Sequence, residues 1–293
     1  MGAAVNLGSR AATFEDVKDV PAGQFNYGGS TTWAPNRGEI DPLLEAAWSS
    51  FDLTYVDPAN QPASTQAGLE MLLAGELDFA QSSRPLTADE QQAGLVEIPV
   101  AVEGVAIATH PDLTIDSITL AQLKAIYTGQ TTNWQAVGGP DLIVVPIARD
   151  AGGGTVQFFQ TKVLEGAAFA STLQQANTTT EALRLVADTP GSLYFASSPE
   201  IVNQCTIKPL ALQSGNPPAI PPYQPPFVPL ANCPNPRNQT HLEAFESGRY
   251  PLTRPLYIVV RADQPEVGTA YAQLLTSAEG QRLLGRKGFA RLR

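Results

Sequence analysis

Residues 141–159, "DLIVVPIARDAGGGTVQFF", combine an apolar run, an arginine, three consecutive glycines and a second apolar run. The first run is typical of a buried strand, and the second has the length and composition of a helix. Gly152, Gly153 and Gly154 lie at the junction. Such a junction is either a plain strand-to-helix turn or a loop whose backbone N–H groups close around an anion. Both alternatives predict an α/β fold.

Similar junctions recur along the chain, so strands and helices are expected to alternate. Strands are predicted within 22–29, 52–56, 78–86, 141–149, 190–197 and 254–261, with a pair of strands in 96–110. Helices are predicted within 40–51, 65–77, 118–129, 155–166, 178–188 and 269–288. We expect Ser117 or Thr119 to cap the third of these helices, and Gly75 and Gly129 to end the second and third. Residues 214–238 are rich in proline and predict a semi-rigid surface segment.

Composition limits the classes of function. The chain has 293 residues, which is long for one core and suits two domains. Its net charge of -10 excludes a general nucleic-acid surface, which needs clustered Lys and Arg. No segment approaches the roughly 20 apolar residues of a membrane span. The N-terminus, "MGAAV", does not resemble a signal peptide, so either the protein is cytosolic or its export signal has been cut away.

Cys205 and Cys233 flank most of the proline-rich segment. A disulfide between them would contribute about 3 kcal/mol through chain entropy and would indicate an oxidising compartment. The alternative is a pair of buried thiols. No His or Cys cluster nearby indicates a metal site, so neither a metal nor a cofactor is expected.

Hydroxyl-rich loops follow several predicted strands or open predicted helices, at the ligand side of an open α/β sheet. The first turn of a helix has unpaired N–H groups and a partial positive charge, and hydroxyls add further donors. Arg149 adds a planar fork that matches a tetrahedral oxyanion. The candidate anion ligands are Ser30, Thr31, Thr32, Ser64, Thr65, Ser83, Arg84, Arg149, Gly153, Gly154 and Thr155. The alternative for each loop is an ordinary helix N-cap, and for each arginine an ordinary ion pair.

Several motifs carry a family resemblance. They are "GGSTTWAP" (28–35), "STQAGLEMLLAGELDFAQSSRPL" (64–86), "LKAIYTGQTTNW" (123–134), "RDAGGGT" (149–155) and "YPLTRPLYIVV" (250–260). In this order they resemble the phosphate-binding proteins of phosphate ABC transporters, which are type II periplasmic binding proteins. The likeness runs from about Phe25 to the C-terminus and omits much of the proline-rich segment.

The resemblance implies two α/β lobes joined by crossing strands, with the ligand in a cleft between them. It places 22–105 and 258–293 in the first lobe, 106–257 in the second, and 1–21 in an N-terminal extension. It also implies that phosphate contacts come from Thr31 and Thr32, from Ser64 or Thr65, from Ser83 with Arg84 beside it, and from Arg149, Gly153, Gly154 and Thr155. The family's usual Gly-Ser-Gly-Thr loop has Gly153 here in place of its serine. Ser83 stands where some members have an aspartate that accepts the ligand's proton.

The resemblance favours a monomeric, non-enzymatic, extracytoplasmic protein, with or without a lipid anchor, that binds inorganic phosphate and delivers it to a membrane permease. A second hypothesis is a sensory or adhesive module of the same fold that binds another oxyanion or none. An enzyme is disfavoured because the two histidines, His110 and His241, fit no nucleophile or metal spacing. The aromatic residues Tyr27, Trp33 and Trp134 are expected in the core.

Overall fold

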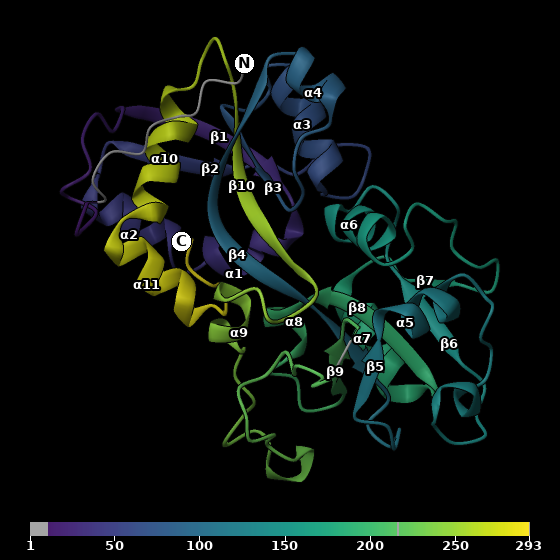
Figure 1. The fold of residues 1–293 in the computed structure, drawn as a ribbon. Coiled ribbons are helices and arrows are strands. Elements are labelled where there is room, and N and C mark those ends of the chain that lie inside the picture. The colour runs from purple at the N-terminus through teal and green to yellow at the C-terminus, as the bar shows by residue number, and fades with distance from the viewer. Residues whose placement is uncertain (1–10, 216, 293) are drawn as a thin grey trace. The chain divides into compact units, whose positions relative to one another are not determined.

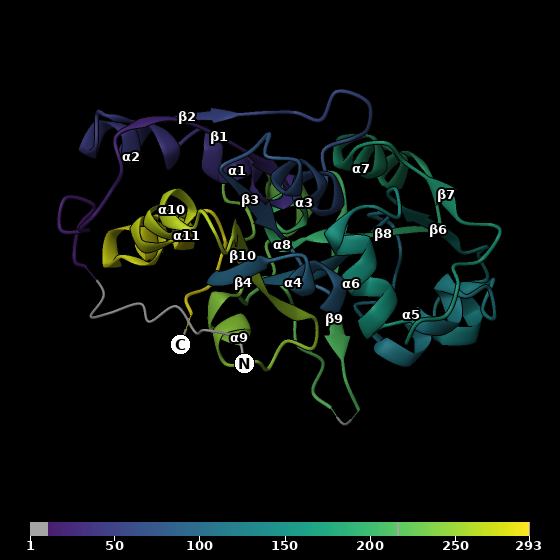
Figure 2. The same cartoon turned by 90° about the horizontal axis from the view of Figure 1, so that it is seen from above.

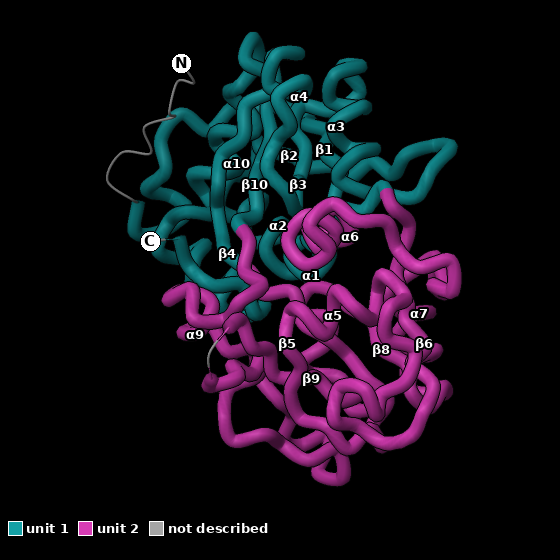
Figure 3. The backbone as a smooth tube through the Cα atoms, turned by 45° about the vertical axis from the view of Figure 1, so that its right-hand side comes forward, with its two compact units in different colours: residues 1–102, 152–154, 255–293 teal, residues 103–151, 155–254 magenta. Residues whose placement is uncertain are grey.

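The structure is a computed structural model that describes residues 11–215 and 217–292. The chain forms two compact units, which Figure 3 colours separately. Unit 1 comprises residues 1–102, 152–154 and 255–293, and unit 2 comprises 103–151 and 155–254. These boundaries lie three residues from the expected lobe boundaries at both crossing strands, and the glycines of the 152–154 loop group with unit 1. Of the expected N-terminal extension, residues 1–10 lie outside the described part, and Phe14 and Val17 are buried in the core of unit 1.

Unit 1 is an α/β unit built on a mixed sheet (Figure 1). Its strands are β1 (Gly23–Gly29), β2 (Phe51–Tyr55), β3 (Phe79–Ser82) and parts of β4 (Leu95–Thr109) and β10 (Thr253–Arg261). The strand order is β2-β1-β3-β10-β4; β1 pairs in parallel with β2 and β3, and β10 is antiparallel to β3. Its helices are η1 (Thr31–Trp33), α1 (Ala34–Arg37), α2 (Asp41–Ala47), α3 (Thr65–Leu73), α4 (Ala88–Gln92), α10 (Glu266–Thr276) and α11 (Ala278–Arg286).

Side-chain alternation along the strands divides the core of unit 1 into two layers. Phe79 and Ile258 face a cluster that contains Ile40, which precedes α2, Leu44 of α2 and residues of α10 and α11. The next residues, Ala80 and Val259, face the opposite cluster, formed with Leu69 and Leu72 of α3. Helices therefore cover both faces of the sheet, as the view from above shows for α3 on one side and α10 and α11 on the other (Figure 2).

Unit 2 repeats this layered arrangement. Its strands are β5 (Ser117–Thr119), β6 (Val145–Ala148), β7 (Gln174–Gln175), β8 (Ser192–Ser197), β9 (Lys208–Gln213) and the remainder of β4 and β10. Its helices are α5 (Leu120–Tyr127), η2 (Trp134–Val137), α6 (Gly154–Lys162, whose first residue groups with unit 1), α7 (Thr179–Asp188), α8 (Ser198–Ile201), η3 (Leu230–Asn232) and α9 (Leu242–Glu246). Tyr194 and Ala196 of β8 pack against Ala182 and Val186 of α7. Phe195 points the other way and stacks on Phe159 of α6 at 3.8 Å between ring centroids.

Several sequence predictions are confirmed in detail. Thr119 caps α5 in a capping box with Gln122. Gly75 and Gly129 follow α3 and α5 with φ of 76° and 80°, a conformation that favours glycine. Tyr27, Trp33 and Trp134 are buried core residues. Cys205 and Cys233 form a disulfide.

Three predictions of element boundaries are wrong. The pair of strands expected in 96–110 is one long strand, β4, which continues through Pro99 and Gly104 without a turn. The closing helix expected over 269–288 is two helices, since Ser277 ends α10 and its hydroxyl accepts from Gly280 N to start α11. The strand expected over 141–149 begins only at Val145. None of the helices among residues 11–215 and 217–292 combines the length and apolar character that a membrane crossing needs.

Candidate anion-binding site

Three hydroxyls from three separate loops meet at the carboxyl edge of the unit 1 sheet. Ser30 follows β1, Thr65 opens α3, and Ser83 follows β3. Ser30 Oγ donates to Ser83 Oγ at 2.9 Å, and Ser83 N donates to Thr65 Oγ1 at 3.2 Å. The two hydroxyl oxygens of Thr65 and Ser83 are 3.3 Å apart. All three residues are at most 3% exposed, so this is a buried polar cluster within one unit.

The hydrogen bonds give this cluster a direction. Ser30 Oγ accepts a hydrogen bond from Thr32 N at 3.3 Å and donates its own hydrogen bond to Ser83 Oγ. A hydroxyl has one proton, so Ser83, as an acceptor from Ser30, keeps its proton for Thr65 or for a ligand. Thr65 likewise accepts from the Ser83 amide and keeps its proton. The cluster therefore holds hydroxyls that accept from their protein neighbours and can donate outward.

Gly154 lies against the same cluster. A Cβ added to this glycine would lie 2.6 Å from Thr65 Oγ1 and closer still to Ser83 Oγ. Gly154 is also the first residue of α6, where the backbone N–H groups lack intrahelical partners. Close approach therefore favours glycine at this position, which brings the start of α6 beside the hydroxyls of Ser83 and Thr65.

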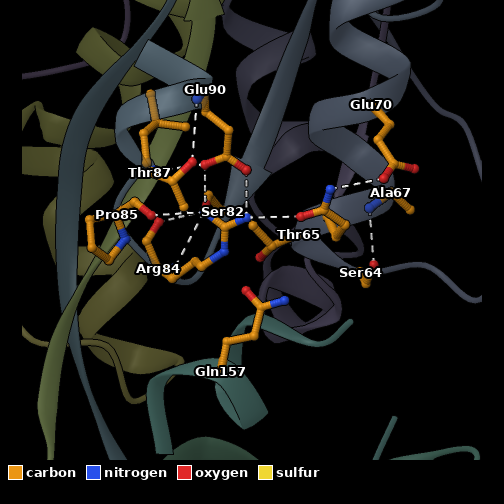
Figure 4. A network of polar contacts seen from close by, with 12 residues as sticks. Ser64, Thr65, Ala67, Glu70, Ser82, Arg84, Pro85, Thr87, Glu90 and Gln157 are labelled. Atoms are coloured by element: carbon orange, nitrogen blue, oxygen red, sulfur yellow. Dashed lines mark hydrogen bonds and ion pairs between the residues drawn. The ribbon is translucent and has the colours of Figure 1, made fainter. Parts of the chain in front are cut away.

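Packing of α3 against β1 positions Thr65. A Cβ on Gly68 would collide with Gly29 Cα and would lie 3.0 Å from Gly29 N. The two glycines let the first turn of α3 approach the end of β1 closely. Ser64 caps the helix by accepting from Ala67 N at 3.1 Å, as Figure 4 shows. Of the other predicted residues of this region, Thr32 is buried and Thr31 is partly exposed.

Arg84 is bound by its own unit. Its Nη1 and Nη2 each donate to Glu90 at 2.7 Å, and they also donate to the Pro85 carbonyl and to Gln66 Oε1 (Figure 4). Glu90 in turn completes a capping box with Thr87 at the start of α4. The Nη groups are thus used within the protein, and the arginine anchors the loop that carries Ser83.

Unit 2 places the remaining predicted side chains between the end of β6 and the start of α6. Arg149 follows β6, and Thr155 lies in the first turn of α6. Arg149 acts electrostatically on Glu200 of α8, whose carboxyl accepts a hydrogen bond from Thr179. Burial of that carboxyl, opposed by the hydrogen bond and by the charges of Arg149 and Arg254, raises the pKa of Glu200 to about 7.

A buried ion pair that the sequence did not predict lies beside Thr155. Arg254 Nε donates to Glu103 Oε1 at 2.7 Å, and Arg254 Nη2 donates to Thr155 Oγ1 at 2.7 Å. The Arg254 side chain is 1% exposed and the Glu103 side chain 0%. The sequence held only a weak signal: each residue is a charge in a mostly apolar strand and needs a partner if it is buried, but β4 also contains Glu97 and β10 also contains Arg261, so the sequence does not show which charges pair.

The described residues offer no cluster of His, Cys, Asp and Glu that could hold a metal ion. A separate cavity of about 560 Å³ lies in unit 2, between the loop after β4 and the proline-rich segment. Tyr223 and Phe227 line it, with ring centroids 5.0 Å apart. The proline-rich segment is held by the disulfide and by Asn238, which bonds both N and O of Val228.

A family model described as the PBP superfamily domain matches residues 22–279, nearly the whole chain. The chain belongs to this superfamily. As a PBP superfamily member it is similar to the phosphate-binding protein PstS of Staphylococcus aureus strain USA300, with 26% identity over 247 residues, 81% of this chain and 68% of the relative.

The PBP superfamily assignment agrees with solved structures. A putative phosphate ABC transporter substrate-binding protein with bound phosphate from Clostridium perfringens has a TM-score of 0.76 at 22% identity, covering 92% of this chain and 100% of that one. An ABC-type phosphate transport receptor from Vibrio cholerae has a TM-score of 0.69 at 23% identity, with the same coverage. The fold is that of the type II periplasmic binding proteins, as predicted.

Proposed function

We propose that this PBP superfamily member binds inorganic phosphate without chemical conversion and delivers it to a membrane ABC permease. The observation that carries the proposal is the convergence of Ser30, Thr65 and Ser83 beside the Gly154 amide. The Ser83 and Thr65 hydroxyls keep protons to donate and no carboxylate belongs to the cluster, which suits a tetrahedral oxyanion. The relatives named as phosphate-binding proteins support phosphate as the oxyanion.

In this proposal the site comprises the eleven residues expected from the sequence, with two different kinds of role. Hydroxyls, amides and the Arg149 guanidinium contact the anion, whereas Ser64 and Arg84 shape the loops that present them. The Cys205–Cys233 disulfide supports an extracytoplasmic location, because disulfides persist in oxidising compartments. No cofactor is needed, and we propose that the protein acts as a monomer.

Isothermal titration with phosphate, arsenate and sulfate tests the proposal. We expect one phosphate per chain, and we expect Ser83→Ala in unit 1 and Arg149→Ala in unit 2 each to weaken that same binding. Removal of the Arg149 fork is expected to cost about 2–4 kcal/mol of binding free energy. Gly153→Ser, which restores the usual hydroxyl, should bind phosphate at least as tightly as the wild type.

The same titrations separate the alternative function. Binding of another oxyanion in preference to phosphate would favour a sensory or adhesive module, for which the Gly153 departure is the motivating feature. Absence of heat and of thermal stabilisation with all three anions at millimolar concentration would contradict the proposed function, since any real ligand stabilises the folded state.

A further inference from the structure

Arg254 is a buried arginine that the anion site proposed above does not use. It is the last residue of unit 2 and lies on β10, and its side chain is 1% exposed. Its Nε and Nη2 both donate to Glu103, on β4. Glu103 also accepts from the Ser197 hydroxyl at the end of β8. A buried guanidinium is thus oriented by a carboxylate that is itself held on both oxygens.

The contact of Arg254 with Thr155 determines the role of the threonine hydroxyl. Arg254 Nη2 lies 2.7 Å from Thr155 Oγ1. A guanidinium can only donate, so Thr155 must accept, and its own proton remains available. Thr155 sits in the first turn of α6, where unpaired amides already favour an anion. Because the Thr155 hydroxyl accepts from Arg254, it can donate its proton to a bound anion.

Two further observations connect Arg254 with an anion. Arg254 Nη1 is buried and has no hydrogen-bond partner among the residues that the structure describes, and buried N–H groups normally have one. The Glu200 carboxyl also interacts with the charges of both Arg149 and Arg254. The two guanidiniums therefore act on one region of unit 2.

We infer that Arg254 is a positioning residue for oxyanion binding, which holds the Thr155 hydroxyl as a donor to the anion and is itself oriented by Glu103 and Ser197. This inference rests on the proposed function. Its ligand class is a small tetrahedral oxyanion such as phosphate. The competing role is purely structural: the Glu103–Arg254 pair would only join β4 to β10 and would not affect how Thr155 binds.

A double-mutant cycle on phosphate affinity separates the two roles. One arm is Thr155→Val, and the other is the charge-neutral pair Glu103→Gln with Arg254→Gln, which leaves no lone buried charge. We expect each arm to weaken phosphate binding about 10- to 100-fold, the value of a hydrogen bond to a charged group. Their combination should weaken binding no more than about threefold beyond either arm, because both remove the same donor.

Matched variants control for indirect effects. Arg249→Gln removes an exposed ion pair with Glu243 in the same unit and should leave the affinity unchanged. Thr155→Ser, which retains the hydroxyl, should recover most of the affinity that Thr155→Val loses. Arg254→Lys keeps the charge without the fork and should fall between the wild type and the neutral pair.

Three results would overturn the inference. The first is wild-type affinity in the Glu103→Gln, Arg254→Gln protein, and the second is a combined loss equal to the product of the two single losses. The third is equal phosphate affinity in Thr155→Val and the wild type. This result still tests the inference if the Arg254 variants do not fold. Failure of the wild type itself to bind phosphate, arsenate or sulfate would contradict the proposed function, and with it this inference.

Discussion

Several polar side chains in this protein are buried, and their hydrogen-bonding neighbours determine whether each can donate or accept. The hydroxyls of Ser83 and Thr155 accept from groups behind them, which leaves their protons for a ligand. Asp41, in the core of unit 1, is also held by its neighbours. Its two carboxylate oxygens accept hydrogen bonds from the Tyr27 and Tyr271 hydroxyls, the latter at 2.7 Å. Burial outweighs these hydrogen bonds and the nearby Arg37 charge, and raises the pKa of Asp41 to about 6.

The raised pKa values predict how stability depends on pH. Asp41 and Glu200 bind protons more tightly in the folded than in the unfolded chain, so the stabilisation that each contributes is fully present below its ordinary pKa, 3.8 for Asp41 and 4.5 for Glu200. It falls as pH rises to about 6 for Asp41 and to about 7 for Glu200. The loss due to Asp41 is about 3 kcal/mol.

Calorimetric unfolding between pH 4 and 8 measures this effect. Asp41→Asn should flatten the decline below pH 6, and Glu200→Gln should flatten its upper part, because neither amide titrates. A decline of the same size in both variants as in the wild type would assign the pH dependence to other groups.

At the scale of elements, close packing at glycines positions the candidate anion site. The first turn of α3 reaches β1 only because Gly68 and Gly29 both lack a Cβ. That approach places Thr65 beside Ser83. The loop after β3 is held from the other side by Arg84 and the α4 capping box.

Gly68→Ala is therefore expected to damage both stability and binding. The new Cβ meets the Gly29 backbone, which cannot rotate away, so we expect a loss of about 1–3 kcal/mol in unfolding free energy. Thr65 should shift with the helix, so phosphate affinity should fall as well. The matched control is Gly38→Ala, where a Cβ meets nothing within 4 Å and φ is −76°. Equal unfolding midpoints in the two variants would contradict this account of α3 packing.

At the scale of the whole molecule, the disulfide lies in a part of the sequence that contains none of the proposed anion-binding residues. The chain passes between the units within β4 and β10 and on either side of residues 152–154. The disulfide closes a segment with a sequence separation of 28 in unit 2, and none of the proposed anion ligands lies in that segment.

Removal of the disulfide should change stability alone. The double variant Cys205→Ser, Cys233→Ser is expected to lose about 3–4 kcal/mol of unfolding free energy, since its unfolded chain is no longer constrained. Phosphate affinity should remain that of the wild type when it is measured well below the new unfolding midpoint. A large fall in affinity there would connect the proline-rich segment to the anion site.

The sequence by itself determined the α/β class, most elements and the loops that carry the candidate ligands, because periodicity, caps and glycines are local signals. It also indicated the core positions of Trp33 and Trp134. Only the tertiary structure decided how the ligand hydroxyls are oriented and what Arg84 and Arg254 contact. Arg254 depends on Glu103, 151 residues away, and a local pattern does not show which distant residues pair. The partner of Arg84, Glu90, is only six residues away, but the choice between an ion pair and a ligand contact is made by the fold.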